Sequence, residues 1–493
     1  MKSNGFLEQM SRGMFWVLLF LTVIRIVAMI VVPLNDSTEA RYAEIARIMV
    51  ETHDWITPMH QYNVPFWAKP PLSTWLSAVS MTYFGVTPFA ARLPALLLSF
   101  GVLALVWGLA RQRSGRLTAI IATIVLASSL YFYLDEGTVM TDPSLLFSTT
   151  LMIVAFWRAV VEQQRTWSYV FFIAMAIGLL AKGPVALILA GMPIGFWVII
   201  ENKWSQIWQR LPWIVGTLLM MAIAFPWYYL AEQKTPGFLN YFIMGEHVQR
   251  FLQPGWQGDK YGFAHTAPLG MIWIYAFMGT IPWCIPGIAW GIRHAKRLPS
   301  LCRDEQGWAR YLLLCALTPL VFFTFARNII YPYVFPSLPA FALLFAEMVK
   351  RSDTHERHIK RFIPVATFCG WGFLVISAIF VWRPEWVAKS QDRVIAAFYA
   401  QHPSQNDSLM YWLEKTDYSA QFYSAGHALS TLDAQVLCQW LSRPGQHYVV
   451  FDAETPPIPA QILTHLTEVD KVTVLSKQFH LFVSHPNVDY CKA

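Results

Sequence analysis

Long apolar stretches constrain the fold of this 493-residue sequence more strongly than any other feature. Hydrophobic residues make up 55% of the chain and charged residues only 14%, which excludes an ordinary soluble enzyme. A helix that crosses a bilayer needs about 20 mostly apolar residues. We predict such spans at residues 14–34, 91–110, 117–134, 143–161, 167–181, 184–200, 211–231, 268–290, 309–326, 332–349 and 362–382. The chain is therefore predicted to be a polytopic α-helical membrane protein with about 11 transmembrane helices (11–13), unless the short pair 167–181 and 184–200 forms a re-entrant hairpin.

Lys and Arg are distributed unevenly between the two faces that these spans define. With the N-terminus in the cytoplasm, the cytoplasmic loops carry 19 Lys and Arg residues, and the opposite loops carry eight outside the C-terminal region. The positive-inside rule then places loops 35–90 and 232–267, together with residues 383–493, outside the cytoplasm. This asymmetry accounts for much of the net charge of +7, so nucleic acid is not an expected partner. Cys438 and Cys491 are the two cysteines placed on the oxidising side, and we predict that they form a disulfide.

The first external loop is predicted to contain two helices. After Asp36, apolar residues recur at helical spacing opposite Glu44, Arg47 and Glu51, which indicates an amphipathic helix on the membrane surface. Asp36 and Glu39 have the spacing of a capping box at the start of this helix. The apolar run 71–85 is too short to cross a bilayer, so we expect a second interfacial helix there.

The C-terminal region differs in character from the rest of the chain. Its strand-like runs lie at residues 408–413, 447–452, 471–476 and 479–484, and its helical runs lie at 433–443 and 459–466. This alternation predicts a small α/β domain. We therefore divide the chain into a transmembrane domain, residues 1–382, and an α/β domain, residues 383–493.

Side chains that suit transfer chemistry gather in segments at the external face. Carboxylates can act as bases there, a Lys supplies a point charge for a phosphate, and an Arg can bind a phosphate through two hydrogen bonds. The candidate site residues are Asp36, Glu39, Arg41, Tyr42, Lys69, Asp142, Lys182, Glu246, His247, Arg250, Arg327 and Tyr333.

Many of these candidates also have a structural explanation. Asp142 can cap the helix that Pro143 begins. Lys69 and Lys182 can extend to the membrane interface, as single lysines at a membrane boundary usually do. Glu246 and Arg250 are four residues apart and can form an exposed ion pair. Spacing alone leaves both interpretations open.

Motifs that the sequence lacks narrow the possible chemistry. It contains no GxxxxGK[ST] loop, no GxGxxG loop and no HExxH motif, so nucleotide-binding signatures and a zinc-protease signature are missing. An external enzyme without a nucleotide site needs an activated donor that the membrane delivers. A polyprenyl-phosphate sugar meets this requirement. The rival interpretation is a lipid or solute transporter, but transporters tend to place binding residues near the bilayer midplane in repeated halves, and no repeat is present.

At these residues the sequence also resembles a known family. The motifs TEARYAEIARIM, KPPLSTW, TDPSLLF, AKGPVAL, FPWYYLA and EHVQRF occur in an order and spacing similar to the bacterial 4-amino-4-deoxy-L-arabinose lipid A transferases. These belong to the GT-C class, which includes protein O-mannosyltransferases. The resemblance covers roughly residues 10–350, so its motifs lie almost entirely outside the predicted α/β domain.

The resemblance implies a GT-C enzyme of the bacterial inner membrane whose site and C-terminal domain face the periplasm. Its donor would be an undecaprenyl-phosphate-linked sugar, and its acceptor would be lipid A or another glycan; an O-mannosyltransferase-like activity is the alternative. We expect a monomer that contacts membrane lipids. Asp142, Asp36 and Glu39 are the expected catalytic carboxylates. The expected ligands of the donor phosphate are Lys69, Arg250, Tyr333, Lys182 and Arg327, and the expected contacts to substrate or metal are Arg41, Tyr42, Glu246 and His247.

The sequence departs from the family pattern at two places. Thr38 and Glu39 stand where the family usually has Asp-Glu, which leaves Asp36 two positions early. Ala68 replaces a Glu that commonly precedes the Lys of the Lys-Pro motif. Because that Glu would pair with His247 at a metal, the replacement argues against a divalent metal site, and no cofactor is assigned.

Overall fold

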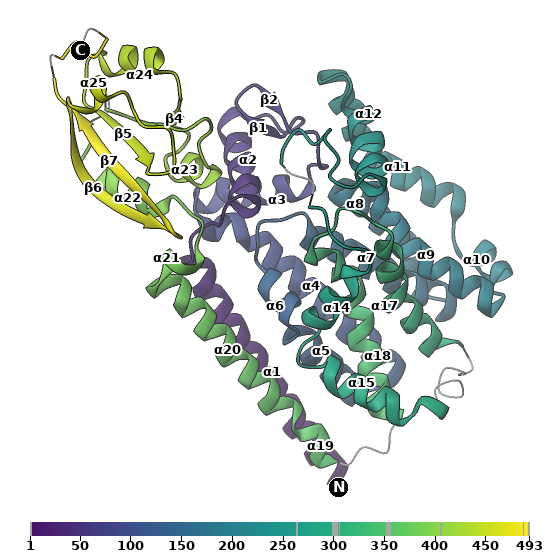
Figure 1. Ribbon diagram of the computed structural model, residues 1–493. Coiled ribbons are helices and arrows are strands. Elements are labelled where there is room, and N and C mark those ends of the chain that lie inside the picture. Colours follow the sequence, from purple (N-terminus) through teal and green to yellow (C-terminus); the bar gives the residue numbers. More distant parts are fainter. Residues whose placement is uncertain are drawn as a thin grey trace.

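The computed structural model describes residues 2–262, 265–297, 304, 306–351, 356–404, 407–486 and 488–491. A bundle of helices carries a small sheet-containing C-terminal unit at one end, where its helix α23 (Tyr418–Tyr423) packs on α2 (Thr38–Thr52) (Figure 1). We call this the domain end of the bundle. The bundle helices are α1 (Lys2–Val31), α4 (Pro88–Ser114), α5 (Arg116–Ala127), α6 (Leu130–Asp135), α7 (Asp142–Phe156), α8 (Arg165–Lys182), α9 (Pro184–Glu201), α11 (Trp213–Lys234), α14 (Met271–Gly279), α15 (Cys284–Arg293), α17 (Trp308–Thr324), α18 (Leu338–Arg351) and α20 (Phe362–Trp382).

Each predicted span coincides with a helix or with two consecutive helices. Within the described residues, seven helices are long and apolar enough to cross a membrane, or eight if one bent pair forms a single span. The bent pair is α14 and α15, which meet at 106° near Pro282, a residue that cannot continue a helical hydrogen-bond ladder. The prediction of a polytopic helical fold is confirmed, and the expected number of spans stays a prediction.

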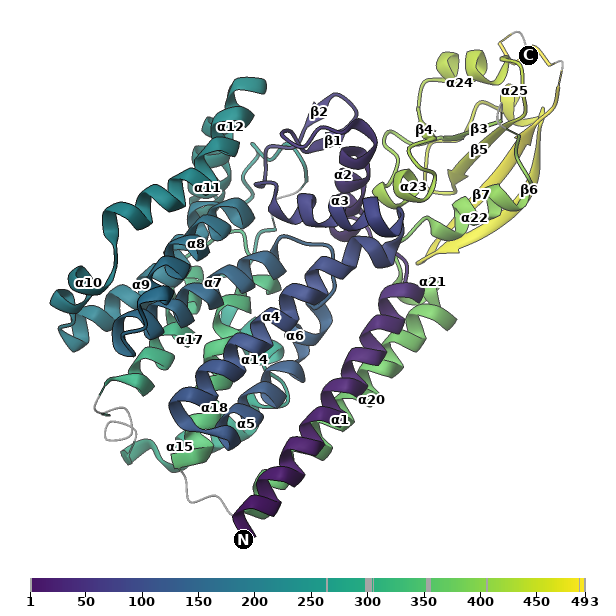
Figure 2. The same ribbon diagram turned by 180° about the vertical axis from the view of Figure 1, so that it is seen from behind.

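Helices α1 and α20 form a distinct layer of the bundle. They run side by side in the same direction in both views (Figures 1 and 2). Gly13 on α1 faces Ile363, and Gly370 on α20 faces Phe20, so small residues allow a close approach. The ring of Phe373 stacks on Tyr133, which joins this pair to the remaining helices.

Short elements connect the longer helices. At the opposite end lie a π-helical extension of α7 (Trp157–Val161), α10 (Trp204–Arg210), a 3₁₀ turn (Ala295–Arg297) and α19 (Glu356–Lys360). At or near the domain end lie β1 (Met59–Gln61), β2 (Val64–Pro65), α12 (Phe238–Asn240), a π-helical stretch (Tyr241–Gln249), α13 (Arg250–Leu252) and a 3₁₀ helix (Tyr331–Ser337). The predicted basic loops 291–310 and 350–361 fall partly outside the described residues.

The first external loop contains the two expected helices, α2 (Thr38–Thr52) and α3 (Leu72–Phe84). The polar side of α2 faces solvent only at Glu51, whose side chain is 52% exposed, while Glu44 and Arg47 are buried. Arg47 is only 4% exposed and pairs with Glu44 at 2.7 Å and with Glu51 at 2.6 Å. Helix α23 (Tyr418–Tyr423) of the C-terminal unit packs on α2 and covers this side. The prediction of a solvent-facing polar side is therefore wrong for Glu44 and Arg47.

The predicted capping box is also wrong. The carboxylate of Asp36 accepts hydrogen bonds from the backbone N–H and the hydroxyl of Ser419 in the C-terminal unit. Glu39 instead forms an ion pair with the buried Arg92 on α4 at 2.8 Å. Arg92 also donates to the backbone carbonyl oxygens of Met29, Val32 and Pro33 at the C-terminal end of α1, where a cation is favourable.

The C-terminal unit has the predicted α/β character. Its elements are α21 (Pro384–Val387), α22 (Asp392–Ala400), β3 (Ser408–Tyr411), α23, β4 (Ala428–Ser430), α24 (Ala434–Leu441), β5 (His447–Asp452), α25 (Ala460–Leu463), β6 (Leu466–Val474) and β7 (Lys477–Ser484). The strand order is β4-β3-β5-β7-β6, with the first three strands parallel and the last two antiparallel to their neighbours. A disulfide joins Cys438 on α24 to Cys491, as predicted.

Candidate active site

Local chain geometry places Asp142 and Lys182 at helix ends that meet. Asp142 begins α7, with Pro143 in its first turn, and Lys182 ends α8. The Lys182 ammonium lies 2.6 Å from the Asp142 carboxylate and 4.9 Å from the centre of the Tyr333 ring. Gly183 follows with φ of +81°, and a Cβ there would lie 2.5 Å from Phe242. A glycine is therefore required where α8 ends beside the site.

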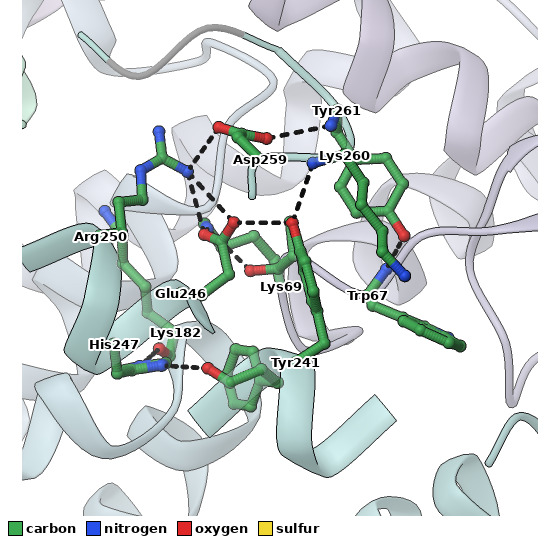
Figure 3. Close-up of polar contacts among 12 residues, drawn as sticks. Trp67, Lys69, Lys182, Tyr241, Glu246, His247, Arg250, Asp259, Lys260 and Tyr261 are labelled. Carbon is green, nitrogen blue, oxygen red and sulfur yellow. Dashed lines mark hydrogen bonds and ion pairs between the residues drawn. The ribbon is translucent and has the colours of Figure 1, made fainter. Parts of the chain in front are cut away.

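A second set of charged residues lies near Lys182 (Figure 3). Glu246 accepts from Lys69 at 2.8 Å and from Arg250 at 3.0 Å, and Arg250 also reaches Asp259 at 3.3 Å. Burial alone would raise the pKa of Glu246, but Lys69 and Arg250 hold it below its ordinary value. The exposed-pair interpretation of Glu246 and Arg250 is therefore wrong, because the Glu246 side chain is 2% exposed and the Arg250 side chain 20% exposed.

The geometry of Glu246 and His247 does not suit a metal ion. Both ring nitrogens of His247 face backbone carbonyl oxygens, that of Phe242 at 2.8 Å and that of Lys182 at 3.2 Å. Glu246 is already engaged by two cations, and Ala68 offers no side-chain ligand. In the part of the chain that the structure describes, no group of three His, Cys, Asp or Glu residues could hold a metal. These side chains therefore do not fit a metal ion.

Two adjoining cavities meet at the charged residues. The first, which we call the polar cavity, has a volume of about 540 Å³. Its predicted lining residues are Arg41, Tyr42, Lys69, Asp142, Lys182, Arg250 and Tyr333. The structure thus brings together seven of the twelve candidates, from segments as distant as α2 and the 3₁₀ helix before α18.

The second, which we call the apolar cavity, has a volume of about 420 Å³. Its apolar lining comprises Leu145, Pro184, Val185, Ile188, Leu189, Ile243, Val248, Phe251, Leu252, Phe322, Phe323 and Ala326. Four residues line both cavities: Lys69, Lys182, Arg250 and Tyr333. Three cationic side chains and a phenol therefore stand at the junction between a polar space and an apolar one. Glu246 and His247 line the apolar cavity.

The remaining candidates lie elsewhere. Asp36 and Glu39 line a neighbouring cavity of about 460 Å³ between α1, α4 and α20. The side chain of Arg327 is exposed and lines none of these three cavities, while its backbone N–H and carbonyl join Phe251 and Ala267. The structure does not bring Arg327 to the charged junction.

Sequence reasoning missed part of the cavity wall. Asp259, Lys260 and Tyr261 come from the loop after α13, and the Tyr261 hydroxyl accepts from the N–H of Trp67 at 3.0 Å. The C-terminal unit contributes residues 415–418, which precede or begin α23. The many aromatic and glycine residues of loop 232–267 could have indicated that residues 259–261 line a site. Residues 415–418 lie outside the region of family resemblance, and no sequence motif marks them.

Several known proteins are similar to this chain in sequence. Residues 11–242 match the family described as Dolichyl-phosphate-mannose-protein mannosyltransferase. An undecaprenyl phosphate-alpha-4-amino-4-deoxy-L-arabinose arabinosyl transferase of Edwardsiella ictaluri is 29% identical over 320 residues, which are 64% of this chain and 55% of the relative. A second such transferase, from Sodalis glossinidius, is 31% identical over 62% of this chain and 54% of the relative. The matched region thus spans little more than half the length of these relatives.

A solved structure resembles almost the whole chain. The crystal structure of ArnT from Cupriavidus metallidurans bound to undecaprenyl phosphate superimposes with a TM-score of 0.74. The superposition covers 96% of this chain and 98% of that one at 19% sequence identity, so it shows a shared fold that includes the C-terminal unit. The archaeal oligosaccharyltransferase AglB from Archaeoglobus fulgidus has a TM-score of 0.51. Together with the apolar helices, these likenesses identify a multi-pass membrane protein.

Proposed function

We propose that this chain, a relative of the bacterial 4-amino-4-deoxy-L-arabinose transferases with the GT-C fold, transfers a sugar from a polyprenyl phosphate to a glycolipid or glycan acceptor such as lipid A. Its relatives are named for an undecaprenyl-phosphate amino sugar, and the ArnT crystal contained undecaprenyl phosphate. We propose the same class of donor, an amino sugar and the lipid A acceptor for the present chain because of these similarities.

The junction of the two cavities carries this proposal. A polyprenyl-phosphate sugar has an apolar chain, an anionic phosphate and a polar sugar in series. The apolar cavity suits the isoprenoid chain, and the polar cavity suits the sugar. Lys69, Lys182, Arg250 and Tyr333 line both spaces, so they stand where the phosphate of such a molecule would lie. Arg and Lys are the usual ligands of phosphate groups in proteins.

The charged residues can assist cleavage of the glycosyl–phosphate bond. As the bond between the anomeric carbon and the phosphate oxygen breaks, its electron pair moves onto the leaving phosphate. Lys69 and Arg250 would stabilise the charge that develops there, an effect that commonly supplies several kcal/mol in transfer reactions. Glu246 holds both cations in place beforehand, so little reorganisation is needed at the moment of reaction.

Asp142 is the proposed carboxylate for the acceptor side. It lines the polar cavity, and its ion pair with Lys182 at 2.6 Å keeps it oriented. If the acceptor is a hydroxyl group, Asp142 would accept its proton as the acceptor oxygen bonds to the anomeric carbon. If the acceptor is a phosphate, its oxygen is already anionic, and Asp142 would orient the sugar or bind its amino group.

A protein hydroxyl acceptor is the second candidate. The family match over residues 11–242 bears the name of protein mannosyltransferases, and a hydroxyl acceptor would use Asp142 as a base. Mass spectrometry of lipid A, surface glycans and exported proteins from a deletion strain separates the two candidates. Loss of a sugar from lipid A supports the first candidate, whereas loss from proteins supports the second.

We further propose that the domain end faces the periplasm of a bacterial inner membrane and that the enzyme acts as a monomer. The loop-charge asymmetry and the Cys438–Cys491 disulfide both support this orientation, because disulfides persist in oxidising compartments. A reporter that is active only in the cytoplasm, fused after Ala493, should give no signal.

Purified full-length protein in lipid nanodiscs provides the direct test of activity. With a polyprenyl-phosphate sugar and lipid A, we expect free polyprenyl phosphate and glycosylated lipid A to accumulate in equal amounts. Movement of the intact donor across a membrane without bond cleavage would instead support the transporter alternative.

A further inference from the structure

Two cations of the polar cavity lie apart from the proposed donor phosphate site. Arg41 comes from α2, and Lys415 comes from the C-terminal unit just before α23. The Arg41 guanidinium donates to the carbonyl of Tyr261 at 2.6 Å. The Lys415 ammonium lies 3.3 Å from the Tyr418 hydroxyl and 3.3 Å from Nε2 of His60. Among the described residues, neither cation has a carboxylate within ion-pair distance, since no salt bridge involves either one.

The positive charges of Arg41 and Lys415 act on each other and on His60. Burial, followed by the positive charges of Lys415 and Arg41, lowers the pKa of His60 to about 3, so this ring is neutral. Burial and then Arg41 also lower the pKa of Lys415. The carboxylate of Asp417, which also lines the polar cavity, accepts a hydrogen bond from the side-chain amide of Gln391 at 3.0 Å. An anion placed between Arg41 and Lys415 would remove this repulsion.

Two buried polar atoms at or beside these cations form no hydrogen bond in the described part of the chain. Among the described residues, the buried Nε of Arg41 and the buried hydroxyl of Thr416 have no hydrogen-bond partner. Both residues line the polar cavity. A buried polar atom without a partner is costly, so a ligand or water that satisfies these atoms is favoured.

The position of this group separates it from the donor. Arg41, Lys415 and Tyr418 line the polar cavity but not the apolar one. The proposed donor phosphate belongs at the junction of the two cavities, where it is joined to its isoprenoid chain. A charged group bound by Arg41 and Lys415 would therefore belong to the other substrate.

We propose that Arg41 and Lys415 form a second anion subsite, which binds a phosphate group of the acceptor, and that the C-terminal unit thereby takes part in acceptor selection. The subsite rests on the proposed function, because it assumes a donor phosphate at the junction. Arg41 can bind phosphate oxygens through two N–H groups, while Lys415 contributes a point charge and Thr416 a hydroxyl donor.

Binding measurements on the full-length protein in nanodiscs test the subsite. The probes are undecaprenyl phosphate, bisphosphorylated lipid A and lipid A from which the phosphates have been removed. The variants are Lys415→Ala, Lys415→Arg and the matched control Lys471→Ala, which removes an exposed lysine from β6 of the same unit. Lys415 is exposed enough that its removal should leave the fold intact, and protease resistance of the C-terminal unit verifies this.

We expect Lys415→Ala to weaken binding of bisphosphorylated lipid A about tenfold, the usual effect of losing one charge-assisted hydrogen bond. Lys415→Arg and Lys471→Ala should bind it like the wild type, and all variants should bind undecaprenyl phosphate equally. Unchanged lipid A binding by Lys415→Ala overturns the subsite, as does an equal loss for dephosphorylated lipid A. A matching loss of undecaprenyl phosphate binding also overturns it, since Lys415 would then serve the donor. Failure of the wild type to bind undecaprenyl phosphate overturns the proposed function itself.

Discussion

The two sides of the polar cavity hold their cations in different ways. At the junction with the apolar cavity, Lys69, Lys182 and Arg250 are each paired with a buried carboxylate. On the opposite side, Arg41 and Lys415 have no such partner in the described part of the chain. Paired cations are pre-positioned and keep a fixed geometry, whereas unpaired cations attract an anion more strongly. We call the side with Lys69, Lys182 and Arg250 the chemical side, because the reaction requires accurately placed charges. We call the side with Arg41 and Lys415 the recognition side, because its net positive charge can attract an anionic group.

The largest expected effect tests the chemical side. Lys69→Ala and Arg250→Ala should each cost about 2–4 kcal/mol of transition-state stabilisation, or roughly 30- to 1000-fold in rate. Turnover of a polyprenyl-phosphate sugar in nanodiscs is the measurement. Lys234→Ala is the matched control, because Lys234 lies at the same end and pairs with Asp54 with a side chain that is 45% exposed. Exposed ion pairs contribute only ~0–1 kcal/mol, so this control should stay near wild type. Near-normal rates in both test variants would contradict the proposed phosphate site.

The next effect concerns pre-positioning of the cations. Glu246→Gln leaves Lys69 and Arg250 close together without their shared carboxylate, which should cost roughly 2–3 kcal/mol of stability. The apparent melting temperature should therefore fall. Undecaprenyl phosphate should raise it more in this variant than in the wild type, because the phosphate replaces the missing charge. Equal stabilisation of the two proteins by the lipid would place the phosphate elsewhere.

A smaller effect concerns the contact between Asp36 and Ser419, which joins the C-terminal unit to the helix bundle. Burial, and secondly the charge of Asp417, raise the pKa of Asp36 to about 7. Because the folded state binds this proton more tightly than the unfolded state, the stability that Asp36 contributes is lost as pH rises through about 7. Asp36→Asn keeps an acceptor for Ser419 without the charge.

The stability advantage of Asp36→Asn should therefore grow as pH rises from about 4 to about 7 and level off at higher pH, reaching roughly 1–2 kcal/mol. Thermal unfolding and proteolytic release of residues 383–493, followed across this range, provide the measurement. A pH-independent difference between Asp36→Asn and the wild type would contradict the raised pKa.

The sequence predicted the chemical side better than the recognition side. Long apolar runs locate the spans, because a bilayer imposes both length and hydropathy on a helix. Lys69, Asp142 and Arg250 lie in motifs whose order along the chain is shared with a known family. The carboxylate partners of Lys69 and Lys182, which are Glu246 and Asp142, come from distant segments, so spacing alone indicated snorkelling lysines. Glu246 and Arg250 are close in sequence, but their burial depends on tertiary packing, so spacing indicated an exposed pair.

The recognition side required tertiary structure. Lys415 lies in an ordinary polar stretch, and only the packing of α23 on α2 brings it beside Arg41. The burial of Arg47 has the same cause, because the C-terminal unit covers a helix face that the sequence pattern assigns to solvent. Docking between segments more than 350 residues apart, such as Asp36 and Ser419, leaves no local pattern in the sequence.

An experimental structure of the full-length protein with undecaprenyl phosphate tests the central claim most directly. We predict that the phosphate lies between Lys69, Arg250 and Tyr333, with the isoprenoid chain in the apolar cavity and the space beside Arg41 and Lys415 left free for the acceptor. A phosphate bound by Arg41 and Lys415, or an isoprenoid chain outside the apolar cavity, would contradict the division of the cavity into a chemical side and a recognition side.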